Sequence, residues 1–142
     1  MRRLGTAIDI EASPAATWRV LIDFAAYPEW NPFIRRFVGE PRVGARLEVT
    51  MQPPGRRTMT FKPTVLVAEP ERELRWLGRV IVPGLFDGEH AFIIETTQAG
   101  CRLRQEEDFR GVLVPLFGAM LADTERGFEA MNRALKQRVE RR

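Results

Sequence analysis

The chain contains a single cysteine and a single histidine among its 142 residues. One cysteine cannot form an internal disulfide, and this pair cannot supply the ligands of a zinc cluster, so we expect no metal site. Glycine-rich phosphate loops and nucleophile elbows are also missing from the sequence, and we expect no cofactor.

Long apolar stretches are missing as well. No run of about 18 apolar residues is present, which excludes insertion into a membrane as a transmembrane helix. The first residues lack the continuous apolar segment of a secretion signal. The sequence therefore predicts a cytoplasmic protein.

Charge of either sign is not concentrated in one part of the chain. The 22 lysine and arginine residues are interspersed with 19 aspartate and glutamate residues, which leaves a net charge of +3. A nucleic-acid-binding surface needs a basic stripe, so we expect no nucleic-acid partner. Hydrophobic residues make up 44% of the chain, enough for one core. We expect residues 1–142 to form a single domain that acts as a monomer or homodimer.

The N-terminal part predicts one strand followed by two short helices. Residues 4–11 alternate between apolar and polar side chains, which is typical of a half-buried strand. Ser13 is suited to cap a helix whose first residue is Pro14. Residues 26–33 contain two prolines and three aromatic residues. Because each proline removes a donor, only a short helical turn or a tight loop fits there.

From residue 34 onward the pattern changes to strands separated by proline and glycine turns. The connections are too short for helical crossovers, so successive strands are expected to run antiparallel. Together with the first strand they predict a seven-stranded curved sheet. The expected strands are residues 34–38, 45–52, 58–68, 73–80, 89–97 and 101–110.

One long helix is expected at the C-terminal end, over residues 115–139. Apolar residues recur there at helical spacing, and charged residues cover the opposite side. At 1.5 Å per residue such a helix extends roughly 38 Å, enough to cross a curved sheet. The sequence therefore predicts an α+β fold in which an antiparallel sheet wraps around the final helix.

The two faces of the last expected strand, residues 101–110, are unlike each other. One face carries only charged residues, whereas Leu103, Gln105, Glu107 and Phe109 share the other. The second face must turn toward the core, where a carboxylate without partners would be costly. We therefore expect Gln105 and Glu107 to project into a cavity with apolar walls and a few polar groups, the usual form of a small-molecule site.

The only histidine belongs to the neighbouring strand. If residues 99–100 form a two-residue turn, Phe92 lies opposite Glu107 and His90 lies opposite Phe109. His90 and Glu107 then become diagonal neighbours on the inward face.

Two interpretations of this group remain open. In the first, His90 acts as a general base that Glu107 orients, while Gln105 holds a substrate carbonyl. In the second, the three side chains satisfy one another as a buried polar network.

Four motifs, together with the order of elements, resemble a known superfamily. They are residues 27–33 (YPEWNPF), 75–78 (RWLG), 88–92 (GEHAF) and 105–111 (QEEDFRG). The chain resembles the SRPBCC (START/Bet v 1-like) superfamily over essentially its whole length, and specifically its polyketide cyclase/dehydrase-like branch. The resemblance implies a helix-grip fold with a deep hydrophobic cavity between the sheet and the C-terminal helix. It implies little about chemistry, because members include carriers and cyclases.

The resemblance also suggests which residues line the cavity. The segment with Trp30, Asn31 and Phe33 adjoins it in that family. For these residues, as for the others, ordinary core packing is the alternative, since aromatic residues and methionines fill most cores. The expected ligand-binding residues are Trp30, Asn31, Phe33, Phe61, Trp76, His90, Phe92, Gln105, Glu107, Phe117, Met120, Thr124 and Phe128.

Three functions fit these expectations. The leading hypothesis is a protein that binds a small lipid-, polyketide- or aromatic-like molecule. The first alternative is a cyclase or dehydratase that uses His90 and Glu107 as an acid/base pair. The second is a module of the chaperone-associated type that binds a protein partner. The sequence specifies neither the ligand, nor a reaction, nor the oligomeric state.

Overall fold

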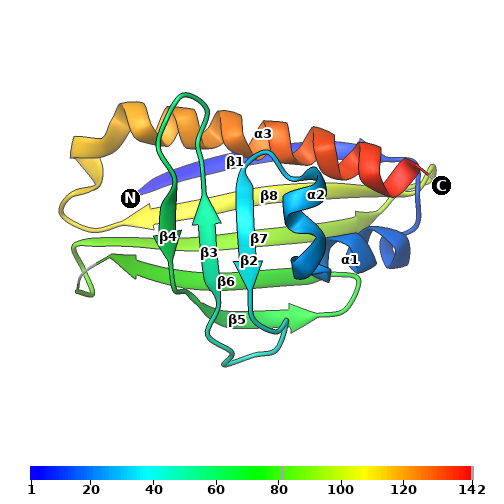
Figure 1. Cartoon of the computed structure of the whole chain (residues 1–142), viewed down its shortest axis with the longest axis horizontal. Coiled ribbons are helices and arrows are strands. Elements are labelled where there is room, and N and C mark those ends of the chain that lie inside the picture. The colour runs from blue at the N-terminus through cyan, green and yellow to red at the C-terminus, as the bar shows by residue number, and fades with distance from the viewer. Residues whose placement is uncertain (81, 142) are drawn as a thin grey trace.

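The computed structural model describes residues 1–80 and 82–141. In this part of the chain, three α-helices and eight β-strands form an α+β fold, the fold class that the sequence predicts (Figure 1). The elements are β1 (Arg2–Ile10), α1 (Pro14–Ile22), α2 (Tyr27–Trp30), β2 (Ile34–Val38), β3 (Glu48–Met51), β4 (Met59–Phe61), β5 (Thr64–Glu69), β6 (Glu73–Val80), β7 (Phe86–Thr96), β8 (Cys101–Arg110) and α3 (Gly118–Glu140).

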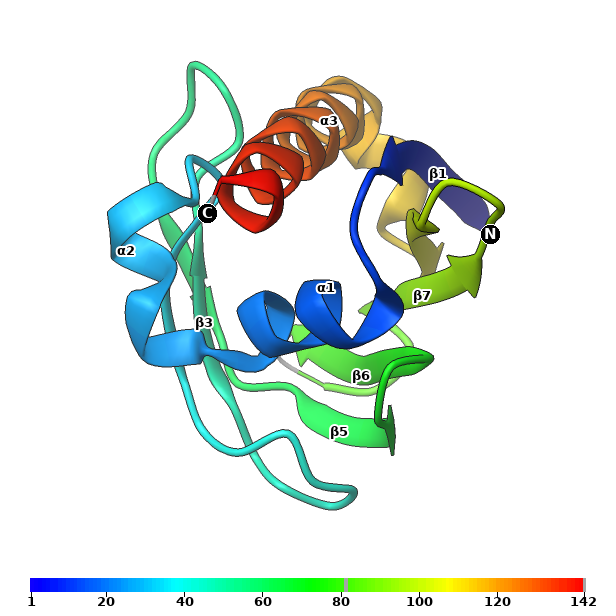
Figure 2. The ribbon, with the colours of Figure 1, turned by 90° about the vertical axis from the view of Figure 1, so that its right-hand side faces the viewer.

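The strands form two antiparallel sheets. The larger sheet has the order β1-β8-β7-β6-β5 and the smaller one the order β2-β3-β4. The strands of the two sheets cross at a steep angle (Figure 1). Viewed end-on, α3 lies along the open side between the sheets (Figure 2). The helix contacts β1 and β8 of the larger sheet, and Phe128 on α3 meets Phe33 just before β2 with ring centroids 5.6 Å apart.

The expectation of seven strands is wrong, because residues 58–68 form two strands, β4 and β5. The break falls at Pro63, which has no backbone N–H to donate to a ladder. Backbone bonds nevertheless join the sheets at this corner. Leu47 N donates to the Pro63 carbonyl at 2.8 Å, and Val65 N donates to the Ala45 carbonyl at 2.9 Å. The two sheets therefore continue into each other as a curved wall.

The helical segments between β1 and β2 follow the sequence-based expectation. Ser13 caps α1, and its hydroxyl oxygen accepts the Ala16 N–H at 3.1 Å. Pro14 is the first helical residue. The prolines downstream limit α2 to four residues, which follow a short 3₁₀ turn.

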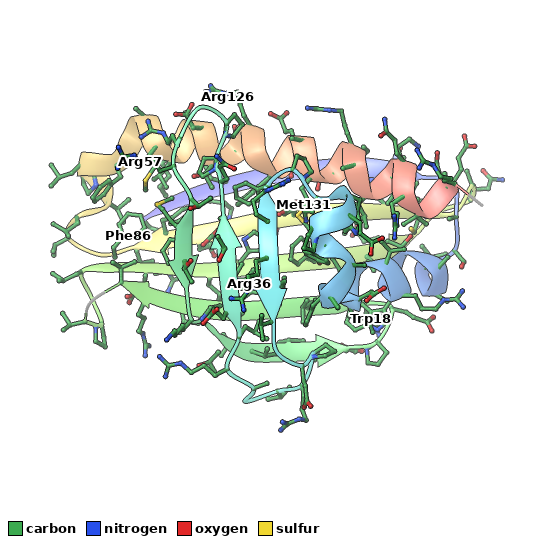
Figure 3. The ribbon with its side chains drawn as sticks, in the orientation of Figure 1. Trp18, Arg36, Arg57, Phe86, Arg126 and Met131 are labelled. Atoms are coloured by element: carbon green, nitrogen blue, oxygen red, sulfur yellow. The ribbon has the colours of Figure 1, made fainter. Side chains whose placement is uncertain are left out.

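The long helix α3 begins later than expected, at Gly118, because Val114–Phe117 form a 3₁₀ turn. Phe117 therefore leaves the buried stripe. It is 37% exposed and packs against Phe86, with ring centroids 5.2 Å apart. The stripe itself is buried along its length, through Leu121, Thr124, Phe128, Met131, Leu135 and Val139. Figure 3 shows Met131 between α3 and the strands, and Arg126 on the outer side of the helix. None of the helices in residues 1–80 and 82–141 has the length and apolarity needed to cross a membrane.

The β7–β8 hairpin has a different register from the expected one. Thr96 pairs with Cys101, and Thr97 and Gly100 exchange backbone hydrogen bonds at 3.0 and 3.4 Å, so the two-residue turn lies at residues 98–99 instead of 99–100. A side chain at Gly100 would approach the Ala12 carbonyl oxygen to 2.6 Å, which shows how closely the loop packs on the end of β1. The pairing moves by two positions, and His90 lies directly opposite Glu107. Because side chains alternate with a period of two, the inward face keeps the expected residues.

The outward face of β8 is held by ion pairs. Arg102 pairs with Asp9 at 2.8 Å, and Asp108 pairs with Arg3 at 2.6 Å. The hydrogen bond from the Arg3 guanidinium lowers the pKa of the Asp108 carboxyl. The contrast between the faces of this strand is therefore as the sequence predicts.

We expect Gly127→Ala to lower the free energy of unfolding by about 1–3 kcal/mol, as overpacking does in other cores. A Cβ on Gly127 would clash with the ring of Phe33, whose side chain is 1% exposed and cannot move aside. Urea unfolding followed by circular dichroism measures the effect.

Gly118→Ala is the matched control, because its Cβ would meet only the Arg2 Nη1 atom at 3.7 Å. This variant should keep the wild-type stability or gain up to about 1 kcal/mol from helix propensity. Equal stabilities of both variants would contradict the close packing of α3 against Phe33.

Cys101 should resist thiol reagents in the folded protein. Its side chain is fully buried, and its Sγ atom lies 3.2 Å from the Thr17 hydroxyl. Burial raises the pKa of the Cys101 thiol, which lowers its thiolate fraction at pH 8. Release of thionitrobenzoate from Ellman's reagent should be complete in urea and nearly absent without it. Rapid release from the native protein would contradict this burial.

Candidate functional site

A histidine flanked by an acid and an amide lies on the inward face of the larger sheet. His90 on β7 and Gln105 on β8 are fully buried, and Glu107 on β8 is 9% exposed. The His90 Nδ1 atom lies 2.9 Å from Glu107 Oε1, and its Nε2 atom lies 3.0 Å from Gln105 Oε1. Both ring nitrogens are therefore engaged by oxygen atoms.

The hydrogen bonds continue from the sheet to α3 and to β1. Gln105 Nε2 donates to Asn132 Oδ1 at 2.8 Å and to the Phe128 carbonyl at 3.3 Å. Asn132 Nδ2 donates to the Thr6 hydroxyl at 2.8 Å, and this hydroxyl donates to the backbone carbonyl of Gln105 at 3.1 Å. The chain Thr6–Asn132–Gln105–His90–Glu107, here called the polar chain, thus links β1, α3, β8 and β7.

The polar chain determines where one proton of His90 lies. The Thr6 hydroxyl uses its only hydrogen on a backbone carbonyl, so it must accept from the amide nitrogen of Asn132. The Asn132 oxygen then faces Gln105, which must donate to it. Gln105 is left with its oxygen toward His90. The Nε2 atom of His90 therefore carries a hydrogen, and Nδ1 shares a second proton site with Glu107.

Aromatic rings enclose the imidazole. Trp76 stacks on His90 with centroids 4.7 Å apart and an interplanar angle of 13°. The rings of Phe92 and Phe128 approach to 4.7 and 4.9 Å. No ring nitrogen of His90 is free to take a proton from a substrate. This geometry is that of a buried polar network.

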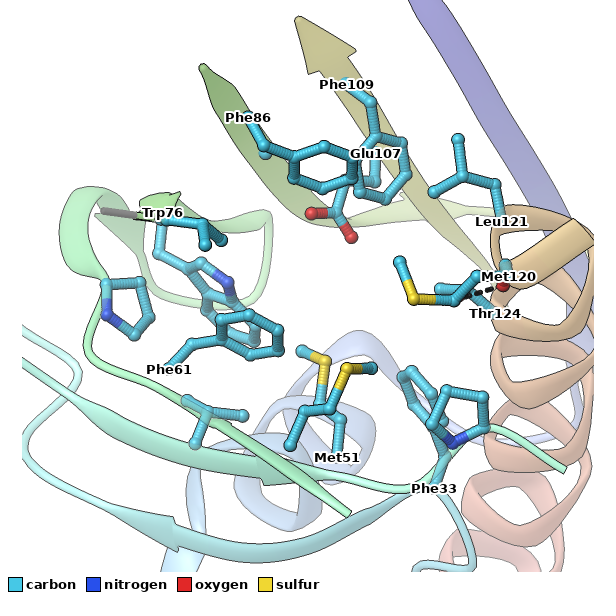
Figure 4. Close-up of a pocket in the computed structure, with 17 residues that line it drawn as sticks. Phe33, Met51, Phe61, Trp76, Phe86, Glu107, Phe109, Met120, Leu121 and Thr124 are labelled. Carbon is cyan, nitrogen blue, oxygen red and sulfur yellow. Dashed lines mark hydrogen bonds between the residues drawn. The ribbon is translucent and has the colours of Figure 1, made fainter. Parts of the chain in front are cut away.

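A cavity lies next to this network, between the two sheets and the first half of α3 (Figure 4). The atom-free space inside it is about 620 Å³, which includes its open mouth. Among the described residues of its wall, Glu107 is the one titratable side chain. The wall consists of Phe33, Val49, Met51, Pro53, Met59, Phe61, Pro63, Trp76, Gly78, Val80, Phe86, Gly88, Glu107, Phe109, Met120, Leu121 and Thr124.

Two glycines leave room beside the carboxylate. Gly78 on β6 pairs with Gly88 on β7, and both line the cavity. A Cβ on Gly88 would clash with the Oε2 atom of Glu107. A Cβ on Gly78 would make ordinary contacts, the nearest at 3.7 Å from Pro63. The space next to Glu107 therefore depends on the missing side chain of Gly88.

The structure brings only part of the expected ligand-binding set to the cavity. The members that line it are Phe33, Phe61, Trp76, Glu107, Met120 and Thr124. The members that do not line it are Trp30, Asn31, His90, Phe92, Gln105, Phe117 and Phe128.

Local packing explains the outlying positions before β2. The Asn31 Oδ1 atom accepts the backbone N–H groups of Phe33 and Ile34 at 2.9 and 2.8 Å, so this side chain holds the turn. Trp30 packs against Tyr27 with ring centroids 5.0 Å apart. Both residues support the segment that carries Phe33 and do not themselves reach the cavity.

Several wall residues lie outside the expected set. Alternation along β8 and β3 predicts inward positions for Phe109, Val49 and Met51, so the sequence contains a signal for these three residues. No sequence pattern indicates that Phe86 and Leu121 approach the same space, because they belong to elements that meet only in the folded protein.

No group of three or more histidine, cysteine, aspartate or glutamate side chains within residues 1–80 and 82–141 is placed to hold a metal ion. At the cavity, the Oε1 atom of Glu107 is hydrogen-bonded to His90. The cavity therefore offers a largely apolar surface with Glu107 Oε2 as its carboxyl oxygen.

The chain matches, over residues 1–140, a protein family described as polyketide cyclase / dehydrase and lipid transport. This match confirms the resemblance drawn from the sequence motifs. Among curated proteins, none matches the chain.

Solved structures share the fold at low sequence identity. Protein MLL2253 from Mesorhizobium loti is 21% identical, with a TM-score of 0.78 and coverage of 99% of this chain and 98% of that chain. A START superfamily protein from Mycobacterium smegmatis is 22% identical, with a TM-score of 0.75 and coverage of 97% of both chains. Ara h 8.0201 is 14% identical, with a TM-score of 0.73 and coverage of 97% of both chains. The expected helix-grip fold is thereby confirmed.

Nitrogen NMR of the imidazole tests the proton assignment. His90 is the only histidine, so its ring signals can be assigned without ambiguity. We expect Nε2 to show the chemical shift and the coupling of a protonated nitrogen, because its partner Gln105 Oε1 can only accept. Urea-unfolded protein serves as the control, since its ring exchanges freely between tautomers. A native Nε2 without a hydrogen would contradict the derived orientation of the polar chain.

Proposed function

Because the chain belongs to the polyketide cyclase/dehydrase and lipid transport family, we propose that it binds a small hydrophobic molecule in the cavity between the two sheets and α3. Membership of this family supports a role in hydrophobic-ligand binding or in polyketide chemistry. The observation that carries the finer proposal is the composition of the wall, which is apolar apart from Glu107 and Thr124. We take residues 1–142 as one ligand-binding domain.

The character of the wall favours binding over other roles. Met51, Met59 and Met120 contribute flexible side chains, which adapt to ligands of irregular shape. Phe61 and Trp76 add flat aromatic surfaces across the cavity from Met120 (Figure 4). Apolar walls with one or two placed polar groups are the common form of small-molecule sites.

The polar groups at the cavity are few for acid/base catalysis. The Thr124 hydroxyl donates to the Met120 carbonyl at 2.9 Å and is therefore already paired. Glu107 is the one titratable group among the wall residues that the structure describes, and His90 is shielded from the cavity by its aromatic neighbours. Binding is therefore our first proposal.

A cyclase or dehydratase is the second candidate, because one carboxylate oxygen does face the cavity and the family description includes such enzymes. In that case Glu107 would exchange the proton and His90 would position it. The substitution His90→Ala separates the two candidates. A carrier retains most of its affinity, whereas an enzyme loses turnover while its binding persists. A protein-partner module is less consistent with an open cavity of this kind.

Filling the cavity should abolish binding without unfolding the protein. In Gly78→Val, the added side chain enters the cavity from β6, and its Cβ meets no atom closer than 3.7 Å. We expect binding of the neutral fluorescent probe N-phenyl-1-naphthylamine to weaken by roughly tenfold or more. Fluorescence titration measures the affinity, and circular dichroism checks the fold.

Gly5→Val is the matched control, since it adds the same side chain to an exposed strand position with no atom within 4 Å. This variant should bind the probe like the unmodified protein. If Gly78→Val bound the probe as tightly as Gly5→Val does, the cavity would not be the binding site. Native mass spectrometry of protein from its own host would then identify any retained molecule.

A further inference from the structure

The two carboxyl oxygens of Glu107 have different surroundings. Its Oε1 atom is held by His90, whereas Oε2 has no hydrogen-bond partner within residues 1–80 and 82–141. Figure 4 shows the Glu107 carboxylate among Phe86, Phe109 and the other wall residues. The side chain is 11% exposed, and Glu107 is part of the cavity wall. A carboxyl oxygen that faces a largely apolar cavity takes its hydrogen-bond partner from a water molecule or a ligand.

Oε2 is a hydrogen-bond acceptor wherever the shared proton lies. His90 Nε2 carries its hydrogen toward Gln105, which leaves Nδ1 and Glu107 Oε1 to share one proton site. If the proton is on Nδ1, Glu107 is a carboxylate and Oε2 accepts. If the proton is on Oε1, Oε2 is the carbonyl oxygen of the acid and also accepts.

The carboxylate cannot turn to change this arrangement. Oε1 is fixed by the imidazole, and Trp76, Phe92 and Phe128 surround that ring. Stacking on the indole of Trp76 also suits an imidazolium form of His90, because the face of an aromatic ring attracts cations. The polar chain therefore presents a fixed acceptor to an apolar space.

We propose that the ligand of this cavity is an apolar, flat molecule that carries a hydroxyl group and donates it to Glu107 Oε2. The proposal rests on the proposed function and specifies the chemistry of the ligand. The aromatic wall holds its ring system, and the hydroxyl supplies the missing partner of the carboxyl group. A ligand with a free carboxylate, such as a fatty acid, is excluded from this end of the cavity. Its carboxylate oxygens can only accept hydrogen bonds, and Glu107 Oε2 is also an acceptor.

Matched naphthalene ligands test the proposal. 2-Naphthol carries the donor, 2-methoxynaphthalene lacks it, and 2-naphthoate replaces it with an anion. We expect 2-naphthol to bind roughly tenfold more tightly than the methyl ether. The naphthoate should bind most weakly. Isothermal titration calorimetry or the fluorescence of the ligands gives the three affinities.

Two substitutions of Glu107 are expected to affect the preference for 2-naphthol differently. In Glu107→Leu the acceptor is lost, so the preference for 2-naphthol over its ether should disappear. In Glu107→Gln a neutral His90 keeps its Nε2 hydrogen for Gln105, and Nδ1 then accepts from the new amide group. The amide oxygen is left toward the cavity, so this variant should retain the direction of the preference.

Glu106→Gln is the matched control on the opposite face of β8, where Glu106 pairs with Arg104 at 3.0 Å. It should leave all three affinities unchanged. If Glu107→Leu fails to fold, the ligand series with the unmodified protein and with Glu107→Gln still decides the question.

The outcomes distinguish this inference from the proposed function. Equal affinities for 2-naphthol and its ether, or tighter binding of the naphthoate, would overturn the donor requirement while ligand binding stands. A Glu107→Gln variant that prefers the ether would also overturn it. Absence of binding for all three compounds and for N-phenyl-1-naphthylamine would instead refute the proposed function.

Discussion

The structure depends on the requirement that polar groups buried on the inward face of the larger sheet find partners. Gln105 and His90 lie on that face without contact to solvent, and each would be costly there alone. Asn132 on α3 and Thr6 on β1 complete their hydrogen bonds. The same bonds fix the helix over the sheet, because one partner is on α3 and the others are on strands. A polar chain of this kind defines a unique packing more sharply than apolar contacts do, since its geometry permits few alternatives.

The cavity and the polar chain meet at one residue. The carboxyl group of Glu107 ends the chain on one side and enters the cavity on the other. The pair of glycines on β6 and β7 keeps the adjacent space open, and a side chain at Gly88 would occupy the position of the carboxylate. The small sheet then closes the cavity from the opposite side with Met51 and Phe61. A single acidic position therefore connects the stability of the core with the recognition of a ligand.

Much of the architecture follows from short-range patterns in the sequence. Alternation along residues 101–110 predicts their inward face, and Ser13 followed by Pro14 predicts the start of α1. The extra strand arises at Pro63, because a residue without a backbone N–H interrupts the ladder. The helix α3 starts late because Val114–Phe117 form a 3₁₀ turn, which leaves Phe117 outside the buried helical stripe.

The periodicity of the chain is sufficient to assign the elements, their faces and the acidic residue that enters the interior, because these properties depend on neighbours in sequence. It is not sufficient for the register of β7 and β8, since a shift of two residues leaves every side chain on the same face. The turn at residues 98–99, closed by the backbone bonds between Thr97 and Gly100, sets this register and places His90 opposite Glu107. Only the folded arrangement excludes His90 from the cavity and admits Phe86 and Leu121, because the distances between elements far apart in the chain are set by packing in three dimensions.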